Sequence, residues 1–326
     1  MTPSLRTGGE CLVFDCSLDW VADLIAEGSA GELRDSETAA DGIVICVESK
    51  RTPFETRGLA RLSRGAWHRE GEVVLENACT SGFDLRARSN RDGWEFSYRW
   101  RPPARDRAAG WVLRSRFHLL ARAVLMQYPA LWCAGLCGRA PLHASAWTNA
   151  DSTVLVTGSS GIGRSTLLLR ELEAGARATG DNLAVGDGSA LWGLVEPMRV
   201  SGGSGRHMAH GRREVPMDGR IEAVGPDAVV VLERGSTDRP VVCPCSPDAA
   251  ARALVTNTYA AGELRRYWPL AATLAAGTGA GPAQPPVSEV ATAFVADRPC
   301  FSLSLATSPG ASLRGLLAAP EVAECF

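Results

Sequence analysis

The sequence predicts an α/β protein with two domains, and three observations support this fold class. Residues 153–157 form a short apolar, β-branched run that is typical of a buried parallel strand. A glycine-rich turn and then a stretch with helical spacing, Ser165–Ala174, follow that run directly, and Gly175 closes the stretch. The first 135 residues instead carry short alternating segments. We therefore predict a smaller strand-rich α+β accessory domain with a connecting helix over residues 1–138, followed by an α/β domain over residues 139–326.

Length and composition fit a two-domain protein of ordinary type. The chain has 326 residues, and single hydrophobic cores rarely grow much beyond about 250–300 residues. Its net charge of -2 gives no electrostatic reason to expect nucleic acid or an anionic membrane as a partner. It has no apolar run of the ~18 residues that a membrane span needs, and its N-terminus has no basic stretch before an apolar one. We expect a cytoplasmic protein.

The elements expected in the first domain follow from local pattern. An irregular, solvated linker is expected at residues 101–107, and a helix with apolar spacing at Arg114–Ala134. A hairpin turn is expected at residues 90–93. The alternating segments predict strands at Cys11–Cys16, Gly42–Glu48, Glu72–Glu76 and Trp94–Trp100.

The ten cysteines lack the spacing of a zinc site, so we expect most of them to be reduced and to act as small apolar residues. Cys243 and Cys245 flank a proline. A turn with two buried thiols is the favoured interpretation there, and a redox or metal site is the alternative.

The turn after the predicted strand has the form of a phosphate-binding loop. The residues Gly158–Thr166 read GSSGIGRST, which matches G-x-x-x-x-G-K-[ST] except that arginine replaces lysine. Glycines at these offsets let backbone N–H groups surround a phosphate at the N-terminus of a helix, and a chance glycine turn is the alternative. The residues predicted to bind nucleotide are Gly158, Ser159, Ser160, Gly161, Ile162, Gly163, Arg164, Ser165 and Thr166. Ser165 is also predicted to ligate Mg²⁺, with Thr166 beside it.

Arg164 is the unusual residue of this loop. A lysine ammonium is a compact charge, whereas a guanidinium is planar and prefers fork-shaped contacts. Lys50 is the chain's one lysine, so no neighbouring lysine replaces the missing ammonium unless Lys50 itself folds in. We expect nucleotide binding to survive this replacement more easily than catalysis.

Acidic and basic residues further along the chain are candidates for the same site. Asp181 and Asn182 follow the next short segment, where they would bind Mg²⁺ or abstract a proton, or would form a turn. The segment Ser201–Arg213 carries arginines and histidines, including His210, and suits either a cover over phosphates or a solvated loop. A buried strand is expected at residues 228–233 and a helix at residues 257–268.

Two stretches resemble a known family. Pro141–Ser145 reads PLHAS, and residues 154–185 contain the loop and then Asp181–Asn182; in this order they are similar to the core of the HPr kinase/phosphorylase family and its shorter HPr kinase-like relatives. Residues 291–319, with a late strand at 299–303, resemble the C-terminal end of those relatives. The resemblance implies a P-loop kinase domain of the HPr kinase/phosphoenolpyruvate carboxykinase type.

The resemblance also implies roles for individual residues. Gly158–Thr166 would bind ATP with Mg²⁺, Asp181 would be the base toward an acceptor hydroxyl, and His143 would lie beside the phosphates. Asn182 stands where the family has a second aspartate near the metal, which implies weaker Mg²⁺ binding. Arg164 would share in neutralising the transferred phosphoryl group.

The function implied is that of an ATP-dependent phosphotransferase acting on a serine or threonine hydroxyl of a protein or ribosomal peptide, because the shorter relatives often accompany peptide natural-product enzymes. The alternative is a catalytically impaired nucleotide-binding protein that recruits a peptide or a partner enzyme, and Arg164 and Asn182 support it. The sequence leaves oligomeric state open, although HPr kinases typically assemble from several copies.

Overall fold

The computed structural model describes residues 2–36, 42–90, 93–149, 152–202, 205–208, 211–235, 239–305 and Leu313. The chain forms two compact units. Unit 1 contains residues 1–137, 201–214 and 265–285, and unit 2 contains residues 138–200, 215–264 and 286–326. The first boundary falls next to the one that the sequence predicts, but two later segments lie in unit 1 instead of in the second domain. Residues 201–214 and 265–285 belong to unit 1 because their tertiary contacts are with that unit.

Unit 1 is built on one mixed sheet with the strand order β3-β1-β2-β4-β9-β8-β7-β6-β5. The β2–β4 and β4–β9 pairs are parallel, and the other pairs are antiparallel. The four strands predicted from alternation are confirmed as β2, β4, β7 and β9. The bounds are β1 Thr2–Thr7, β2 Glu10–Cys16, β3 Arg34–Ser36, β4 Ile43–Glu48, β5 Ala60–Ser63, β6 Ala66–Arg69, β7 Glu72–Leu75, β8 Phe83–Asn90 and β9 Gly93–Trp100.

The hairpin between β8 and β9 closes where the sequence places a turn. Asn90 pairs with Gly93, and the two residues between them, Arg91 and Asp92, lie outside the described residues.

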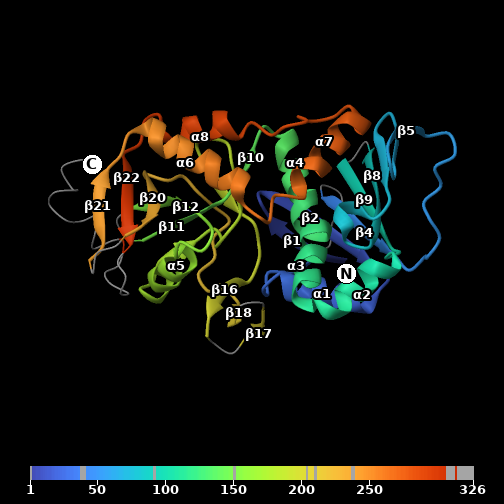
Figure 1. Ribbon diagram of the computed structural model, residues 1–326, viewed down its shortest axis with the longest axis horizontal. Helices are drawn as coiled ribbons and strands as arrows, with labels where there is room; N and C mark the ends of the chain where they lie inside the picture. The colour runs from blue at the N-terminus through green and yellow to red at the C-terminus, as the bar shows by residue number, and fades with distance from the viewer. Residues whose placement is uncertain are drawn as a thin grey trace. The chain divides into compact units, whose positions relative to one another are not determined.

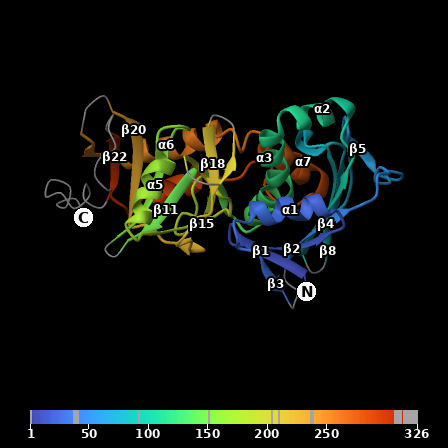
Figure 2. The same cartoon turned by 90° about the horizontal axis from the view of Figure 1, so that it is seen from below.

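Four helical segments of unit 1 pack against this sheet or each other (Figures 1 and 2). They are α1 (Asp19–Gly28), α2 (Ala104–Val112), the run of α3 (Arg114–Arg122), a π-helical turn and α4 (Tyr128–Leu136), and α7 (Tyr267–Thr278). The helix predicted at residues 114–134 is confirmed. The linker predicted at residues 101–107 is wrong in its second half, because α2 begins at Ala104, directly after Pro103. Proline favours a helix start because its fixed φ and missing N–H cost nothing there.

The run Arg114–Leu136 has the length and composition of a membrane span, and it is the one such helix among the described residues. The apolar window of this helix is 83% buried inside the protein. Burial of this kind is what a core helix shows.

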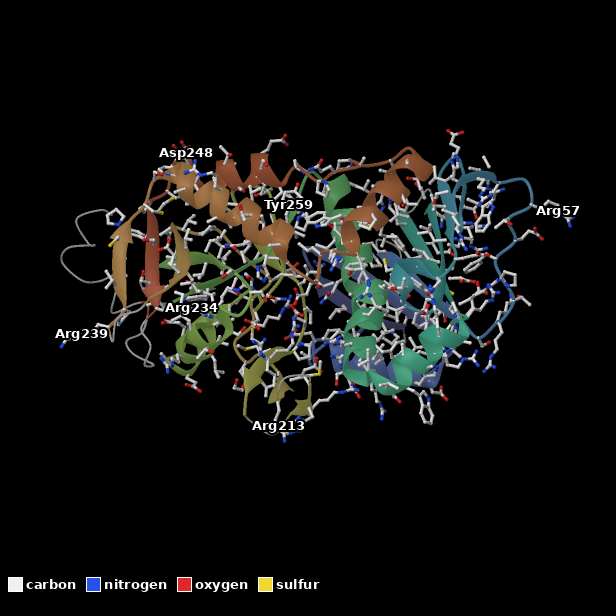
Figure 3. The ribbon with its side chains drawn as sticks, viewed as in Figure 1. Arg57, Arg213, Arg234, Arg239, Asp248 and Tyr259 are labelled. Atoms are coloured by element: carbon white, nitrogen blue, oxygen red, sulfur yellow. The ribbon has the colours of Figure 1, made fainter. Side chains whose placement is uncertain are left out.

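The segment 201–214 belongs to unit 1 because its charged residues are bound there. Its described part forms a hairpin of β17 (Arg206–His207) and β18 (Arg212–Val215). Arg206 pairs with Glu27 of α1, and Glu214 accepts two hydrogen bonds of 2.8 Å from the buried Arg122 of α3. Figure 3 labels Arg213 on this hairpin, where its Nη1 donates to the carbonyl of Gly205 at 2.8 Å. The described residues therefore do not form the loose cover that was one interpretation of the sequence, and His210 lies outside them.

Unit 2 contains two sheets. The larger has the order β13-β11-β12-β20-β22-β21, with β12, β20 and β22 parallel to one another, and the smaller has the antiparallel order β10-β14-β15-β19. Figure 1 shows α5 on one face of the larger sheet and α6 and α8 on the other. The strands of these two sheets are β10 Ala140–Leu142, β11 Ala144–Thr148, β12 Thr153–Gly158, β13 Arg177–Ala178, β14 Ala184–Gly186, β15 Leu191–Gly193, β19 Ala223–Val224, β20 Ala228–Arg234, β21 Val241–Pro244 and β22 Cys300–Leu305. Strand β16, Met198–Ser201, belongs to neither of these two sheets.

The apolar runs of unit 2 form its core, as the sequence predicts. The strands expected at 153–157, 228–233 and 299–303 are confirmed as β12, β20 and β22, and the helix expected after the glycine loop is α5, Arg164–Glu173. Val156, Val230 and Phe301 from the three parallel strands are fully buried together with Leu168 of α5. This core fixes the end of β12 and the start of α5, which carry the candidate site.

Two local predictions in unit 2 are wrong. Residues 257–268 do not form one helix: α6 (Pro247–Ala260) ends at Ala261, whose ψ of 120° leaves the helical region, and α7 begins at Tyr267. Figure 3 labels Asp248 and Tyr259 near the two ends of α6. Cys243 lies exposed on strand β21 instead of in a buried turn, because this edge strand pairs on one side only. The nine cysteines among the described residues are free thiols, and Cys325 lies outside that range.

Candidate phosphate-binding site

The glycine loop joins the C-terminal end of β12 to the N-terminus of α5. Gly161 and Gly163 have φ of 79° and 117°, in the left-handed region that favours glycine. At Gly158 the constraint is space, because an added Cβ would lie 2.9 Å from Ile162 Cγ2 and 3.0 Å from Leu232 Cβ. The tip, Ser159–Gly161, is exposed. Strand, exposed glycine turn and helix start are thus in the arrangement that binds anions through main-chain N–H groups.

We expect Gly163→Ala to destabilise unit 2 by about 1–2 kcal/mol, because an L-residue at this positive φ is strained. The new Cβ would also lie 3.1 Å from Leu305 Cδ1. Urea unfolding of the variant measures the loss. Gly262→Ala is the matched control, since its φ is not positive and its Cβ meets no atom within 4 Å. Equal stabilities of the two variants would contradict the strain argument.

Arg164 points into the protein, away from the exposed tip of the loop. Its side chain is buried, with the residue 6% exposed. The guanidinium contacts three residues, His143, Asp181 and Asn182. Nη1 donates to the carbonyl of His143 at 3.0 Å and Nε to that of Asp181 at 3.2 Å. Nη2 lies 2.8 Å from His143 Nε2, 2.9 Å from Asn182 Oδ1 and 3.3 Å from the Asn182 carbonyl. Burial lowers the pKa of Arg164, while the charges of Asp181 and Glu263 act to raise it.

This geometry gives Arg164 a structural task. All three nitrogens of the guanidinium hold backbone and side chains behind the loop, so the cation sits where it braces the loop's base. The contact with phosphate oxygens that the sequence suggested would require the guanidinium to leave these partners. The reason is the one that separates arginine from lysine, since a fork of five N–H donors suits several fixed acceptors at once.

His143 lies in the same buried layer, between β10 and β11. Its backbone N–H donates to Thr258 Oγ1 at 3.0 Å, and its backbone carbonyl accepts from Thr157 Oγ1 at 3.2 Å as well as from Arg164. Ring Nε2 lies 2.8 Å from Arg164 Nη2 and 3.0 Å from Asn182 Oδ1. A neutral ring accepts from Arg164 when its proton is on Nδ1 and donates to Asn182 when its proton is on Nε2. Burial and then the charge of Arg164 lower the pKa of His143 to about 4. His143 is therefore neutral at pH 7, and its ring lies between Arg164 and Asn182 behind the loop.

We expect stability to fall as the pH drops from 6.5 to 4, because His143 titrates near 6.5 when unfolded and near 4 when folded. With the folded pKa the lower one, the unfolded chain binds the proton first; the contribution is complete above pH 6.5. Its size is about 3 kcal/mol. His118 of unit 1, with a pKa also lowered to about 4 by burial and the charge of Arg206, acts in the same direction.

The measurement is urea unfolding across this pH range. His143→Gln, which keeps an acceptor for Arg164, should flatten the pH dependence, whereas the exposed His207→Gln should leave it unchanged. A slope that is identical in the parent and in His143→Gln would contradict the argument.

Ser165 and Asp181 meet directly at the start of α5. Ser165 Oγ donates to Asp181 Oδ2 at 3.0 Å, and Asp181 is 3% exposed. Its carbonyl is held by Arg164 and by Ser145 Oγ, which fixes the backbone of residue 181. The other carboxylate oxygen, Oδ1, is buried and accepts no hydrogen bond from the described residues. A buried carboxylate oxygen without a partner is costly unless something binds it.

Asn182 does not share that environment. Its Oδ1 accepts from Arg164 Nη2, so the amide oxygen is already engaged and the metal role predicted for Asn182 has no support in this geometry. Ser165 and Asp181 are therefore the two predicted residues whose oxygens lie together at the loop.

Near the site lie charged residues that were not among the predicted site residues. Arg199 lies between Glu196 at 3.3 Å and Glu263 at 3.2 Å. Burial acts to lower the pKa of Arg199, but the two carboxylates outweigh it and raise that pKa. Burial acts to raise the pKa of Glu263, and the charge of Arg199 is the main influence that lowers it. Glu196 and Arg199 are close in the sequence, whereas Glu263 reaches Arg199 from a distant segment that no local pattern connects with it.

α6 contributes two more missed residues near its C-terminal end. Thr258 Oγ1 accepts from the backbone N–H of His143, and Asn257 Nδ2 donates to Thr157 Oγ1 at 3.3 Å, on the strand that leads into the loop. Nothing in the local sequence marks this pair, because the contacts arise from how α6 crosses β12.

No protein-family model and no curated protein matches this chain. A solved structure that is similar in part is the Hpr(Ser) kinase/phosphatase from Coxiella burnetii, with 17% sequence identity over 32% of this chain and 76% of that chain, and a TM-score of 0.24. The chain is a mixed α/β protein with several sheets. Its function is therefore inferred from its own residues.

Proposed function

We propose that unit 2 binds ATP with Mg²⁺ at residues 158–166 and transfers the γ-phosphoryl group to a serine or threonine hydroxyl of a protein or peptide. The observation that carries the proposal is the Ser165–Asp181 pair, which puts a hydroxyl and a buried carboxylate at the helix start that follows the glycine loop. Phosphoryl transfer needs a phosphate cradle, metal-binding oxygens and a proton acceptor, and these residues supply all three.

The residues fit a magnesium ion in the chemistry of their donors. Ser165 Oγ is a hard oxygen donor of the kind that Mg²⁺ prefers, with phosphates and water completing its shell, and the unpartnered Asp181 Oδ1 is left to accept a proton. Among the described residues no group of three or more His, Cys, Asp or Glu side chains is placed to hold a metal by itself, so the site depends on the nucleotide. When bound, the ion would neutralise charge on the phosphate oxygens.

Asp181 is the residue we assign as base. Its carboxylate accepts the proton of the acceptor hydroxyl while that oxygen bonds to the γ-phosphorus and the bond from this phosphorus to the β–γ bridging oxygen breaks, leaving ADP. The buried position of Asp181 and its fixed backbone hold the carboxylate in one place. The main-chain N–H groups of the loop stabilise charge on the phosphates.

A second function, nucleotide binding without transfer, is favoured by the inward position of Arg164. With the guanidinium engaged behind the loop, the cation normally supplied next to the β/γ-phosphates is missing. Such a protein would recruit a peptide or a partner enzyme in a nucleotide-dependent way.

Calorimetry and a transfer assay separate the two functions. The parent should bind ATP in the presence of Mg²⁺, Ser165→Ala should bind more weakly, and Thr256→Ala, an exposed hydroxyl of α6, should match the parent. Incubation with γ-labelled ATP and serine-containing peptides then tests transfer. Label on a peptide supports the phosphotransferase, whereas binding without label, with label gained by Arg164→Lys, supports the second function. Absence of binding of both adenine and guanine nucleotides would refute both.

A further inference from the structure

We propose that unit 1 carries a docking groove for an acidic peptide segment with large apolar side chains. The groove lies along α2 and the start of α3, where a cavity of about 620 Å³ is lined by residues that include Trp100, Asp106, Arg107, Trp111, Arg114 and Phe117. We call it the α2 groove. Figures 1 and 2 both draw α2 at the surface of unit 1.

Apolar residues in the α2 groove and directly beside it are unusually exposed: Trp111 lines the groove, and Val112 and Leu113 follow it in the chain. Helix α2 buries none of its residues, and the exposed fractions are 89% for Trp111, 82% for Val112 and 46% for Leu113. Exposed apolar area costs about 25 cal/mol per Å², and monomeric proteins rarely leave such residues side by side without a partner. Aromatic residues at a surface are also the ones that most often anchor binding partners.

The floor of the α2 groove is packed before any ligand arrives. The ring of Trp100 lies 5.4 Å from that of Phe117 and 5.2 Å from that of Trp20 on α1. Gly82 allows this arrangement, because an added Cβ would lie 2.6 Å from the Trp100 ring. A preformed aromatic floor lowers the entropic cost of binding an apolar side chain.

The charge of the α2 groove is positive. Asp106 is the one acid among the described lining residues, and it is engaged: it accepts from Asn77 Nδ2 at 2.6 Å and pairs with Arg105 at 3.3 Å. Arg107 and Arg114 form no ion pair with any described residue. An adjoining cavity of about 470 Å³ shares Trp100 and Arg107 with the groove and adds Arg51.

Arginines beside an aromatic floor suit a peptide whose carboxylates flank apolar side chains. A second copy of the chain docked symmetrically through this face would set arginines against arginines, which disfavours self-association. The net charge of -2 likewise gives nucleic acid no long-range attraction to the chain. An acidic, apolar peptide is the occupant that satisfies both features of the α2 groove.

The test is fluorescence anisotropy of the full chain with a short fluorescein-labelled peptide in which glutamates flank one leucine and one phenylalanine. Binding should weaken with added salt. Arg107→Glu combined with Arg114→Glu should raise the Kd about tenfold or more, and so should Trp111→Ala. Arg57→Glu is the control, since Arg57 is exposed and lines neither cavity, and it should bind like the parent; Figure 3 labels Arg57. These side chains are exposed, so circular dichroism should show unchanged folding.

Several outcomes would overturn the proposal. One is absence of peptide binding at about 1 mM, the weak limit of specific recognition. Others are equal binding of a peptide with lysines in place of the glutamates, tighter binding of oligothymidylate than of the peptide, and a dimer in sedimentation that Trp111→Ala dissociates. The α2 groove and the proposed function are tested separately. Peptide binding in the absence of nucleotide supports the groove, whether or not the chain binds nucleotide.

Discussion

Asp181→Asn should lower the rate of phosphoryl transfer by about 10²–10⁴-fold, the usual contribution of a positioned general base. The amide has the shape of the carboxylate and its oxygen still accepts from Ser165 Oγ, so the loop and its helix keep their geometry. The amide has no capacity to take the hydroxyl proton at neutral pH. Single-turnover transfer from γ-labelled ATP to an accepted peptide measures the effect, and calorimetry reports whether nucleotide still binds.

The matched control for this experiment is Asp187→Asn. Asp187 is also followed by a turn in unit 2, and its carboxylate caps the backbone N–H groups of Ser189 and Ala190. It should retain the parent's transfer rate. Transfer by Asp181→Asn at the parental rate would remove Asp181 from the mechanism while leaving nucleotide binding at the loop untouched.

Arg164→Met should lower the free energy of unfolding of unit 2 by about 3–5 kcal/mol, the cost of removing one member of a buried charged network. Three carbonyls, those of His143, Asp181 and Asn182, would lose their guanidinium donor. The Asp181 carboxylate would also lose a nearby positive charge. Arg164→Lys keeps the charge but has fewer and less widely spread donors, and it should lose about 1–3 kcal/mol.

Urea unfolding measures both losses, with Arg252→Met as the control. Arg252 is exposed on α6, and its replacement should change stability by less than about 0.5 kcal/mol. A parental stability for Arg164→Met would mean that the guanidinium does not brace the loop. If Arg164→Met keeps the parental stability but no longer binds nucleotide, Arg164 contacts the phosphates of the bound nucleotide, as the sequence predicts.

Much of the local structure was predictable because it depends on short-range pattern. The strand β12, the glycine loop and α5 follow from a β-branched run, from glycines that reach positive φ and from helical spacing. The sequence identifies Arg164 as the unusual residue of the loop, but the direction in which its side chain points was not predictable. A loop arginine has two sets of acceptors within reach, and only the folded positions of His143 and Asn182 show that the inner set is occupied.

The limits of sequence reasoning are clearest where distant segments meet. The helix expected over residues 257–268 carries a suitable pattern, yet α6 ends at Ala260 and the boundary between the units follows Leu264, so α6 and α7 belong to different units. The assignment of residues 201–214 to unit 1 rests on pairs such as Arg122–Glu214, which lie far apart in sequence. The α2 groove was not predicted from the sequence, because residues 101–107 have the composition of a solvated linker.

The sequence by itself determined that a glycine turn between a buried strand and a helix offers main-chain donors to an anion, because φ preference and apolar periodicity are local properties. The tertiary structure alone decided where the charges go: Arg164 inward against carbonyls, Asp181 against Ser165, and Glu263 against Arg199. Charged side chains are long and find their partners across the fold, so their roles depend on neighbours that no local pattern specifies.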